Sequence, residues 1–256
     1  MLRLKTMTFN MQNGQAWDPA RPDEAPINLD NTIGFIKDLD CDICFLQEVE
    51  FPHQELPDPD DHPNFDRLRA GLPGYHASFS YPAATRGHLP FGVGLAIFSR
   101  LPLLRQFHVV LPAADIMFAF RGKNWFPAER SIIGASIEQD GQEVLLLNTH
   151  LQAYFMIDSN SDEFPQQRHI LEVLLRGRKV PTILGGDFNC TDTEGTVAGI
   201  EATGMRTLQN RQITWHRMPF VLDHIFYSPE FRVESKAVAT TKVSDHDAMT
   251  GTLVLD

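Results

Sequence analysis

The stretch Ile183-Leu184-Gly185-Gly186-Asp187-Phe188-Asn189 is the starting point for predicting both the fold and a functional site. Residues 181–184 form a short apolar run bounded by proline and glycine, which predicts a buried strand. We expect Gly185 and Gly186 to stop this strand and let the backbone turn sharply. Asp187 and Asn189 then stand on a loop at a strand end, where polar chemistry is commonly mounted. Taken alone, the segment could equally be a turn built from turn-forming residues.

The composition is typical of a globular chain with a substantial core. Of the 256 residues, 43% are hydrophobic and 21% are charged, which are ordinary values for such a chain. The 22 basic and 33 acidic residues give a formal net charge of −11. This charge argues against a general polyanion-binding surface, because non-specific nucleic-acid affinity depends on Lys and Arg that neutralise phosphates. It does not exclude a nuclease with a locally basic groove or a bound cation.

Targeting and cysteine signals are weak. No apolar run approaches the roughly 18 residues of a membrane span, and residues 1–11 lack the apolar segment of a signal peptide. We therefore expect a cytoplasmic protein with no membrane span.

Cys41 and Cys44 form a single Cys-x-x-Cys pair. Residues i and i+3 of a strand point to opposite faces, so the pair is not expected to bind zinc.

Strand and helix patterns alternate along the chain. Residues 2–9 alternate apolar and polar, residues 27–39 have helical spacing, and residues 43–46 form an apolar run, which together favour a layered α/β protein. Further strands are predicted at 75–81, 93–99, 104–111, 131–137, 143–148, 221–227, 231–240 and 249–255, and helices at 64–70, 162–176 and 196–202. No repeat, low-complexity segment or linker interrupts the pattern, so we expect one domain over residues 1–256.

Six polar clusters lie at or near the ends of the predicted strands. They are Asn10, Gln47-Glu48, Asn148-Thr149-His150, Asp187-Phe188-Asn189, Asp223-His224 and Ser244-Asp245-His246. Each alone has an ordinary structural explanation, but a sheet can bring successive strand ends to one cleft. Carboxylate and amide oxygens without a cysteine partner suit a hard cation such as Mg²⁺ or Mn²⁺. Histidines beside them can hydrogen-bond a phosphate or act as acid–base groups.

These motifs resemble those of the endonuclease/exonuclease/phosphatase superfamily, the fold shared by DNase I, apurinic endonucleases, inositol polyphosphate 5-phosphatases and neutral sphingomyelinases. They occur in the family's order from residue 8 to residue 247. The most specific part is Gly185 to Asn189 followed by Ser244-Asp245-His246, behind Gln47-Glu48. The resemblance implies an α/β fold, a four-layered α/β/β/α sandwich of two packed, mostly antiparallel sheets flanked by helices. The active site would lie across the top of the two sheets.

The resemblance also implies roles in metal and water binding. Glu48 would be the main ligand of Mg²⁺ or Mn²⁺, with Asn10 beside it. Asp245 would be an additional metal or water ligand. Asp187 would orient or deprotonate the attacking water, and Asn189 would hold the scissile phosphate.

Five further residues are implied to contact the substrate or to support its binding. His246 would contact a phosphate oxygen and stabilise the transition state, and Asp223 would hold its ring. His150 would be a second phosphate contact, and Arg130 stands where many members keep an arginine. Asn148, in the same motif as His150, is expected among the substrate-binding residues. The physical logic agrees, because a cation, a cationic histidine and amide donors supply positive field where phosphoryl charge develops.

Two positions depart from the family pattern or match it loosely. Gln12 stands where several nucleases have an acidic residue, which weakens a second-metal or apurinic-endonuclease interpretation. Tyr154 is the nearest candidate for the family's catalytic tyrosine.

Residues 116–126, which include Trp125 and the basic residues Arg121 and Lys123, are expected to help choose the substrate. The alternative is a buried hairpin, since aromatic residues more often pack than bind.

Three functions remain open from the sequence. The favoured one is a metal-dependent phosphoester hydrolase acting on a small-molecule, lipid-derived or sugar phosphate. The second is a DNA or RNA nuclease with the same catalytic groups, because one fold hosts several substrates. The third is a non-catalytic binding module, which predicts loss of the polar set. Glu48, Asp187 and His246 are all present, so the third function is disfavoured.

Overall fold

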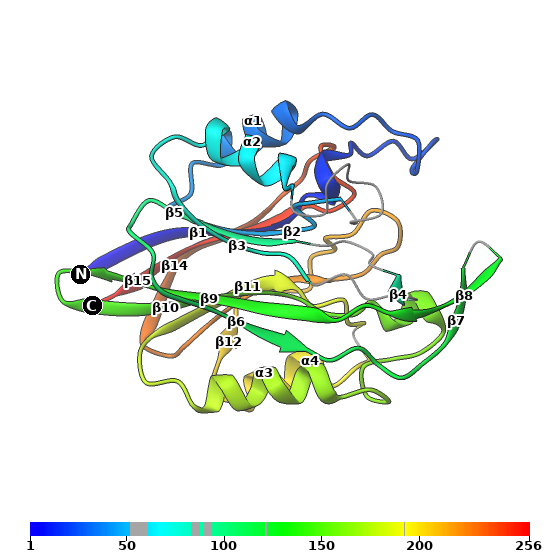
Figure 1. Ribbon diagram of the computed structural model, residues 1–256. Coiled ribbons are helices and arrows are strands. Elements are labelled where there is room, and N and C mark those ends of the chain that lie inside the picture. Colours follow the sequence, from blue (N-terminus) through cyan, green and yellow to red (C-terminus); the bar gives the residue numbers. More distant parts are fainter. Residues whose placement is uncertain (52–60, 83–87, 90–93, 121, 192) are drawn as a thin grey trace.

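The computed structural model describes residues 1–51, 61–82, 88–89, 94–120, 122–191 and 193–256. Two six-stranded sheets pack face to face, and helices cover the outer face of each (Figure 1). The predicted four-layered sandwich is therefore confirmed.

The strands of the first sheet are, in spatial order, β14 (Phe231–Ala239), β15 (Ala248–Leu255), β1 (Leu2–Asn10), β2 (Ile43–Gln47), β5 (Leu95–Ser99) and β3 (His76–Ser80). Those of the second are β12 (Arg206–Thr207), β13 (Asp223–Tyr227), β11 (Thr182–Asp187), β10 (Gln142–His150), β9 (Arg130–Gln139) and β6 (Leu104–Leu111). A small third sheet contains β4 (His88–Leu89), β8 (Lys123–Pro127) and β7 (Phe118–Phe120).

One parallel pair lies in the middle of each large sheet, β1 with β2 and β10 with β11. The other neighbouring strands described in these two sheets are antiparallel. Parallel strands need a crossover connection, and helices α1 (Leu29–Leu39) and α3 (Gln166–Arg176) lie in the two crossovers. Because both strands of a parallel pair end at the same edge, Asn10 lies opposite Gln47 and His150 lies opposite Asp187.

The helices cover the outer faces of the sheets. Helices α1 and α2 (Pro63–Gly71) lie over the first sheet, and α3 and α4 (Thr196–Glu201) lie over the second (Figure 1). The short 3₁₀ helices η1 (Gln12–Gly14) and η3 (Tyr154–Ile157) follow β1 and β10. Helix α1 begins two residues later than predicted, because the Asn28 side chain accepts hydrogen bonds from the backbone N–H groups of Asp30 and Asn31.

Strand periodicity divides the residues of the central strands between two cores. In β1, Leu2 and Leu4 belong to the core between the sheets, whereas Met7 and Phe9 pack in the cluster that contains residues of α1. In β10, Val144 and Leu146 belong to the core between the sheets, and Asn148 and His150 continue that face because alternate residues share a face. The inter-sheet layer is therefore apolar along most of its length and polar at one end.

The two glycines of β11 do not turn the chain, which corrects the prediction from the sequence. Gly185 and Gly186 lie inside β11, and the strand continues to Asp187. A Cβ atom on Gly185 would lie 2.3 Å from Cδ2 of Phe45 in the opposite sheet, and one on Gly186 would lie 2.5 Å from the carbonyl oxygen of Thr149. The glycines are thus required by close approach of neighbouring elements.

Within the predicted segment 116–126, strands β7 and β8 form a hairpin that is largely exposed. Strands β7 and β8 pair with each other and project beyond the main sandwich (Figure 1). Lys123 and Asn124 are exposed, and Phe126 is 37% exposed. The alternative of a buried hairpin is therefore wrong. Arg121 lies outside the described residues.

The cysteines are free and buried. Cys41 precedes β2, so strand geometry does not apply to it, and both Cys41 and Cys44 lie in the cluster that contains residues of α1. The expectation that the two sulfurs point to opposite faces of a strand is therefore wrong, because Cys41 lies outside the strand. Among the described residues, no helix combines the length and the apolar character needed to cross a membrane.

Candidate active site

One carboxylate oxygen, Oδ2 of Asp187, lies at the centre of the polar cluster. It lies 3.0 Å from Nδ2 of Asn10, 3.5 Å from Nε2 of His150 and 3.8 Å from Nε2 of His246. Asp187 and Asn10 are each 1% exposed. The ends of β1, β10 and β11 and the loop before β15 thus converge at the polar end of the inter-sheet layer.

Glu48 is connected to this centre through Asn10. The Asn10 amide donates from Nδ2 to Oε1 of Glu48 at 3.0 Å, as well as to Asp187, and its Oδ1 accepts a bond from the backbone N–H of Gln12. As placed, Asn10 is a donor that fixes two carboxylates, rather than an oxygen that faces a ligand. Glu48 follows β2 with a φ of 49°, an uncommon backbone conformation of the kind that clusters at functional sites.

His246 is held on one side by Asp223. Its Nδ1 lies 2.8 Å from Oδ2 of Asp223, and the two residues are 4% and 0% exposed. Asp223 begins β13 directly opposite Asp187 in the antiparallel register. The hydroxyl of Ser244 donates to the carbonyl of Asn10 and accepts from the backbone N–H of His246, which attaches the His246 loop to the end of β1.

Burial and charge shift the pKa values of this cluster. Burial and the charge of Asp223 raise the pKa of Asp187 to about 7, although His246 and the Asn10 amide oppose this shift. Burial lowers the pKa of His246, but the carboxylates of Asp223, Asp187 and Asp245 outweigh it and raise the pKa to about 10. Near neutral pH, the site therefore combines a cationic imidazole with a carboxyl group that can accept a proton.

Asn189 and Arg130 lie close to the same centre. The backbone N–H of Asn189 donates to Oδ1 of Asp187, its side chain donates to the carbonyl of Leu151, and its φ is 46°. Arg130 is 6% exposed at the start of β9. Burial lowers its pKa, while the charges of Glu48 and Asp187 raise it.

A model of the endonuclease/exonuclease/phosphatase family matches residues 7–246. The chain belongs to this family. The matched range contains each of the polar clusters predicted from the sequence.

Solved structures with the same fold come from bacteria and from humans. An endonuclease/exonuclease/phosphatase from Bacteroides vulgatus is similar over 100% of both chains, with 21% identity and a TM-score of 0.73. The human Nocturnin catalytic domain with bound sulfate is 20% identical over 99% of this chain and 95% of that one, with a TM-score of 0.64. A mannosyl-6-phosphatase from Bacteroides thetaiotaomicron is 17% identical over 98% and 100% of the two chains, with a TM-score of 0.61. These likenesses show the fold, and no curated protein gives a significant match.

The donor set of the family site fits a hard divalent cation. Burial and the charge of Asp245 raise the pKa of Glu48, so these carboxylates repel each other and a cation would relieve the repulsion. Asp187, Asp223 and His246 also place potential ligand atoms within 4.8 Å of one another. Because Nδ1 of His246 is already bound by Asp223, this trio is better suited to holding the imidazole than to holding a metal.

Two predicted substrate residues lie away from the reacting centre. Asn148 is 0% exposed, and its amide donates to the carbonyls of Leu46 and Ala96 and accepts from Gln47. It joins the two sheets beneath the site, which leaves no exposed surface for a substrate. Trp125 is half-buried on the projecting hairpin, and its Nε1 donates to the carbonyl of Phe120.

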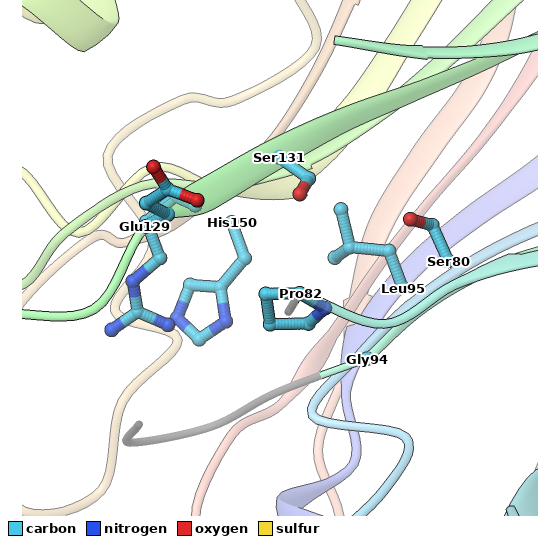
Figure 2. Close-up of a pocket in the computed structure, with 8 residues that line it drawn as sticks. Ser80, Pro82, Gly94, Leu95, Glu129, Ser131 and His150 are labelled. Atoms are coloured by element: carbon cyan, nitrogen blue, oxygen red, sulfur yellow. The ribbon is translucent and has the colours of Figure 1, made fainter. Parts of the chain in front are cut away.

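A small pocket borders the site between the two sheets. It has a volume of about 20 Å³, which is room for about one water molecule. Its lining includes His150 and Arg130 from the second sheet and Ser80 and Leu95 from the first. Figure 2 shows His150 and Glu129 on one side of this pocket and Leu95 and Ser80 on the other.

Sequence analysis missed the segment that precedes β13. Phe155, Trp215 and Phe220 pack together, with ring centroids 5.3–6.2 Å apart, and the Trp215 ring lies 6.2 Å from that of His246. Arg217 binds Asp245. The signal available in the sequence was two aromatic residues in a polar segment just before Asp223, without strand or helix periodicity.

Tyr154 also lies close to the site. It is 2% exposed and stacks on Phe164. Burial raises its pKa to about 12, and the charge of Arg130 opposes this shift. The hydroxyl therefore remains protonated at neutral pH.

Proposed function

We propose that this chain is a divalent-cation-dependent hydrolase that cleaves a phosphoester bond by in-line attack of water. The observation that carries the proposal is the environment of Asp187 Oδ2, which is shared by Asn10, His150 and His246. A carboxylate that can accept a proton here faces two imidazoles that can bind phosphoryl oxygens. This is the combination needed for water attack on an anionic ester.

Each residue has its own role in the proposed reaction. Asp187 orients the attacking water and accepts its proton, and a pKa raised to about 7 suits this role near neutral pH. His246, kept cationic by Asp223, neutralises charge on the phosphoryl oxygens, and His150 hydrogen-bonds a phosphoryl oxygen. Asn189 holds Oδ1 of Asp187 through its backbone N–H.

Glu48 is the residue that we assign to the cation, with Asn10 orienting its carboxylate and Asp245 nearby. Bound Mg²⁺ or Mn²⁺ would supply Lewis-acid polarisation of the phosphoryl group. Arg130, whose buried guanidinium interacts electrostatically with Glu48 and Asp187, adds a fixed positive charge for the substrate.

The favoured substrate is a small-molecule, lipid-derived or sugar phosphate. The formal charge of −11 disfavours a long polyanion, and the aromatic group beside His246 suits a ring-shaped or apolar leaving group. A nuclease remains the competing function.

The test is hydrolysis of bis-p-nitrophenyl phosphate, p-nitrophenyl phosphate and plasmid DNA side by side with Mg²⁺, Mn²⁺ or EDTA. Metal-dependent cleavage of the small esters supports the proposal, and robust, salt-sensitive cleavage of DNA alone supports a nuclease.

A further inference from the structure

The segment Trp215-His216-Arg217 lies against the loop that carries Asp245 and His246. Trp215 forms an antiparallel bridge with His246, and the backbone N–H of His216 donates to the carbonyl of Asp245 at 2.8 Å. Nε1 of Trp215 donates to Oδ2 of Asp245 at 3.3 Å, and Nε of Arg217 donates to the same oxygen at 2.6 Å. Three consecutive residues therefore fix one aspartate.

Arg217 is itself held from the opposite side. Its Nη1 donates to Oδ1 of Asp23 at 2.8 Å, and its Nη2 donates to the carbonyl of Pro22. The guanidinium lies over the Trp17 ring, 5.5 Å from the ring centroid. The side chain of Arg217 is 25% exposed and that of Asp245 is 7% exposed. Since the guanidinium is oriented by four groups, its charge has a defined position beside Asp245.

Two residues, Gln12 and Asn10, link Asp245 to Glu48 by hydrogen bonds. Its backbone N–H donates to Oε1 of Gln12, and the backbone N–H of Gln12 donates to Oδ1 of Asn10, whose amide holds Glu48. Gln12 carries no charge, and Oδ2 of Asp245 already accepts two donors, one of them cationic. A second divalent ion would need the negative charge of Asp245, and this charge is already compensated by the guanidinium of Arg217.

We propose that Arg217 is a built-in cation that neutralises Asp245, so that the site takes a single divalent ion, centred on Glu48. This inference rests on the proposed metal dependence. Arg217 is a positioning residue, because it acts through Asp245 and does not touch the reacting atoms.

The test is Mn²⁺ binding to the full chain without substrate, with free Mn²⁺ measured by electron paramagnetic resonance. The wild-type chain should bind one ion. Arg217→Gln leaves Asp245 uncompensated and should bind Mn²⁺ about 3- to 30-fold more tightly or bind a second ion, as expected when a unit charge is lost at short range. Arg217→Lys keeps the charge and should resemble the wild type.

Two further variants separate charge from structural damage. Asp245→Asn removes the negative charge that Arg217 compensates at the site and should weaken binding. Arg217→Gln/Asp245→Asn, with neither charge, should return to one ion at near wild-type affinity. Damage to the loop predicts the opposite pattern, in which each variant binds more weakly and the double variant most weakly. Arg3→Gln is the matched control, because Arg3 pairs with Glu234 near the other end of β1, and it should bind as the wild type does.

The outcomes are distinguishable. Two ions in the wild type, or unchanged or weaker binding in Arg217→Gln, would overturn the role of Arg217 and leave the metal dependence standing. No binding to the wild type would contradict the metal dependence as well. If Arg217→Gln does not fold, the double variant decides, because it leaves no buried unpaired charge; weaker binding than in the wild type would then overturn the proposal.

Discussion

Nδ1 of His246 lies 2.8 Å from Oδ2 of Asp223, while Nε2 of the same ring lies 3.8 Å from Oδ2 of Asp187. The imidazole is therefore held between two buried carboxylates. Oδ1 of Asp223 has no hydrogen-bond partner among the residues that the structure describes, whereas Oδ2 binds His246. This relationship supports the proposed roles, in which Asp223 holds the ring and Asp187 acts on the substrate water.

Asp223 and His246 should act as a unit. His246→Ala and Asp223→Ala should each lower kcat/KM by about 100-fold or more, the scale of losing one preorganised charged group. The double change should cost little beyond the worse single change, since neither residue works without the other. The measurement is steady-state hydrolysis of a phosphodiester. His108→Ala is the control, because His108 is exposed on β6. Strictly additive losses at Asp223 and His246 would show that they are uncoupled.

The pH profile should report Asp187 and His246. Activity should rise as Asp187 loses its proton, at or below its pKa of about 7 because a bound cation favours the ionised form, and should fall as His246 deprotonates near pH 10. Asp223→Asn removes the strongest of the charges that raise the pKa of His246, so the alkaline limb should move to lower pH. An unmoved alkaline limb would assign that limb to another group.

The stability of the protein should depend on pH through the raised pKa of His246. Because folding raises the pKa of His246, the contribution of its charged form to the free energy of unfolding is complete below the unfolded pKa of about 6.5. This contribution is lost as pH rises through about 10. The difference in unfolding free energy between wild type and Asp223→Asn should thus shrink as pH rises from 6 to 10, as measured by urea denaturation.

Gly185 should be intolerant of a side chain. Gly185→Ala places a Cβ against the Phe45 ring between the sheets, which should lower the free energy of unfolding by about 1–3 kcal/mol. Gly34→Ala is the control, because a Cβ there meets nothing within 4 Å. The substitution removes a glycine from the interior of α1 and should raise the free energy of unfolding by about 0.5–1 kcal/mol. Equal melting temperatures of the two variants would contradict the close packing at Gly185.

Sequence patterns predicted the strands and the converging polar residues because both depend on local chemistry. Periodicity revealed β1, β9 and β10, and the resemblance placed Glu48, Asp187 and His246 in one site. The same patterns misread Gly185 and Gly186, since a turn and a close approach both demand glycine and only the opposing Phe45 distinguishes them.

Other features of the site depend on contacts that no local pattern encodes. Asn148 looked like a substrate ligand because it shares a motif with His150, but the alternation of the pleat and the second sheet bury it against Leu46 and Ala96. Arg217 was missed because its partner Asp245 lies 28 residues away. The exposure of the hairpin formed by β7 and β8 was also unpredictable, since its aromatic residues are equally compatible with a core.

The projecting hairpin should affect substrate choice more than stability. Strand β8 ends three residues before Arg130, so the hairpin is attached directly to the site. Trp125→Ala with Phe126→Ala should raise KM for the physiological substrate and leave turnover of bis-p-nitrophenyl phosphate and the melting temperature nearly unchanged. Equal loss on every substrate together with a lower melting temperature would mean that the hairpin supports the fold.

The central claim is that a divalent cation bound at Glu48 works with Asp187 and His246 on a phosphoester. Hydrolysis of bis-p-nitrophenyl phosphate, measured against Mg²⁺ concentration for wild type and Glu48→Gln, tests it most directly. The wild type should be inactive in EDTA and active with Mg²⁺, and Glu48→Gln should lose most activity at low Mg²⁺ and regain part of it at high Mg²⁺, because one ligand of the cation is weakened. Full wild-type activity in EDTA would contradict the account.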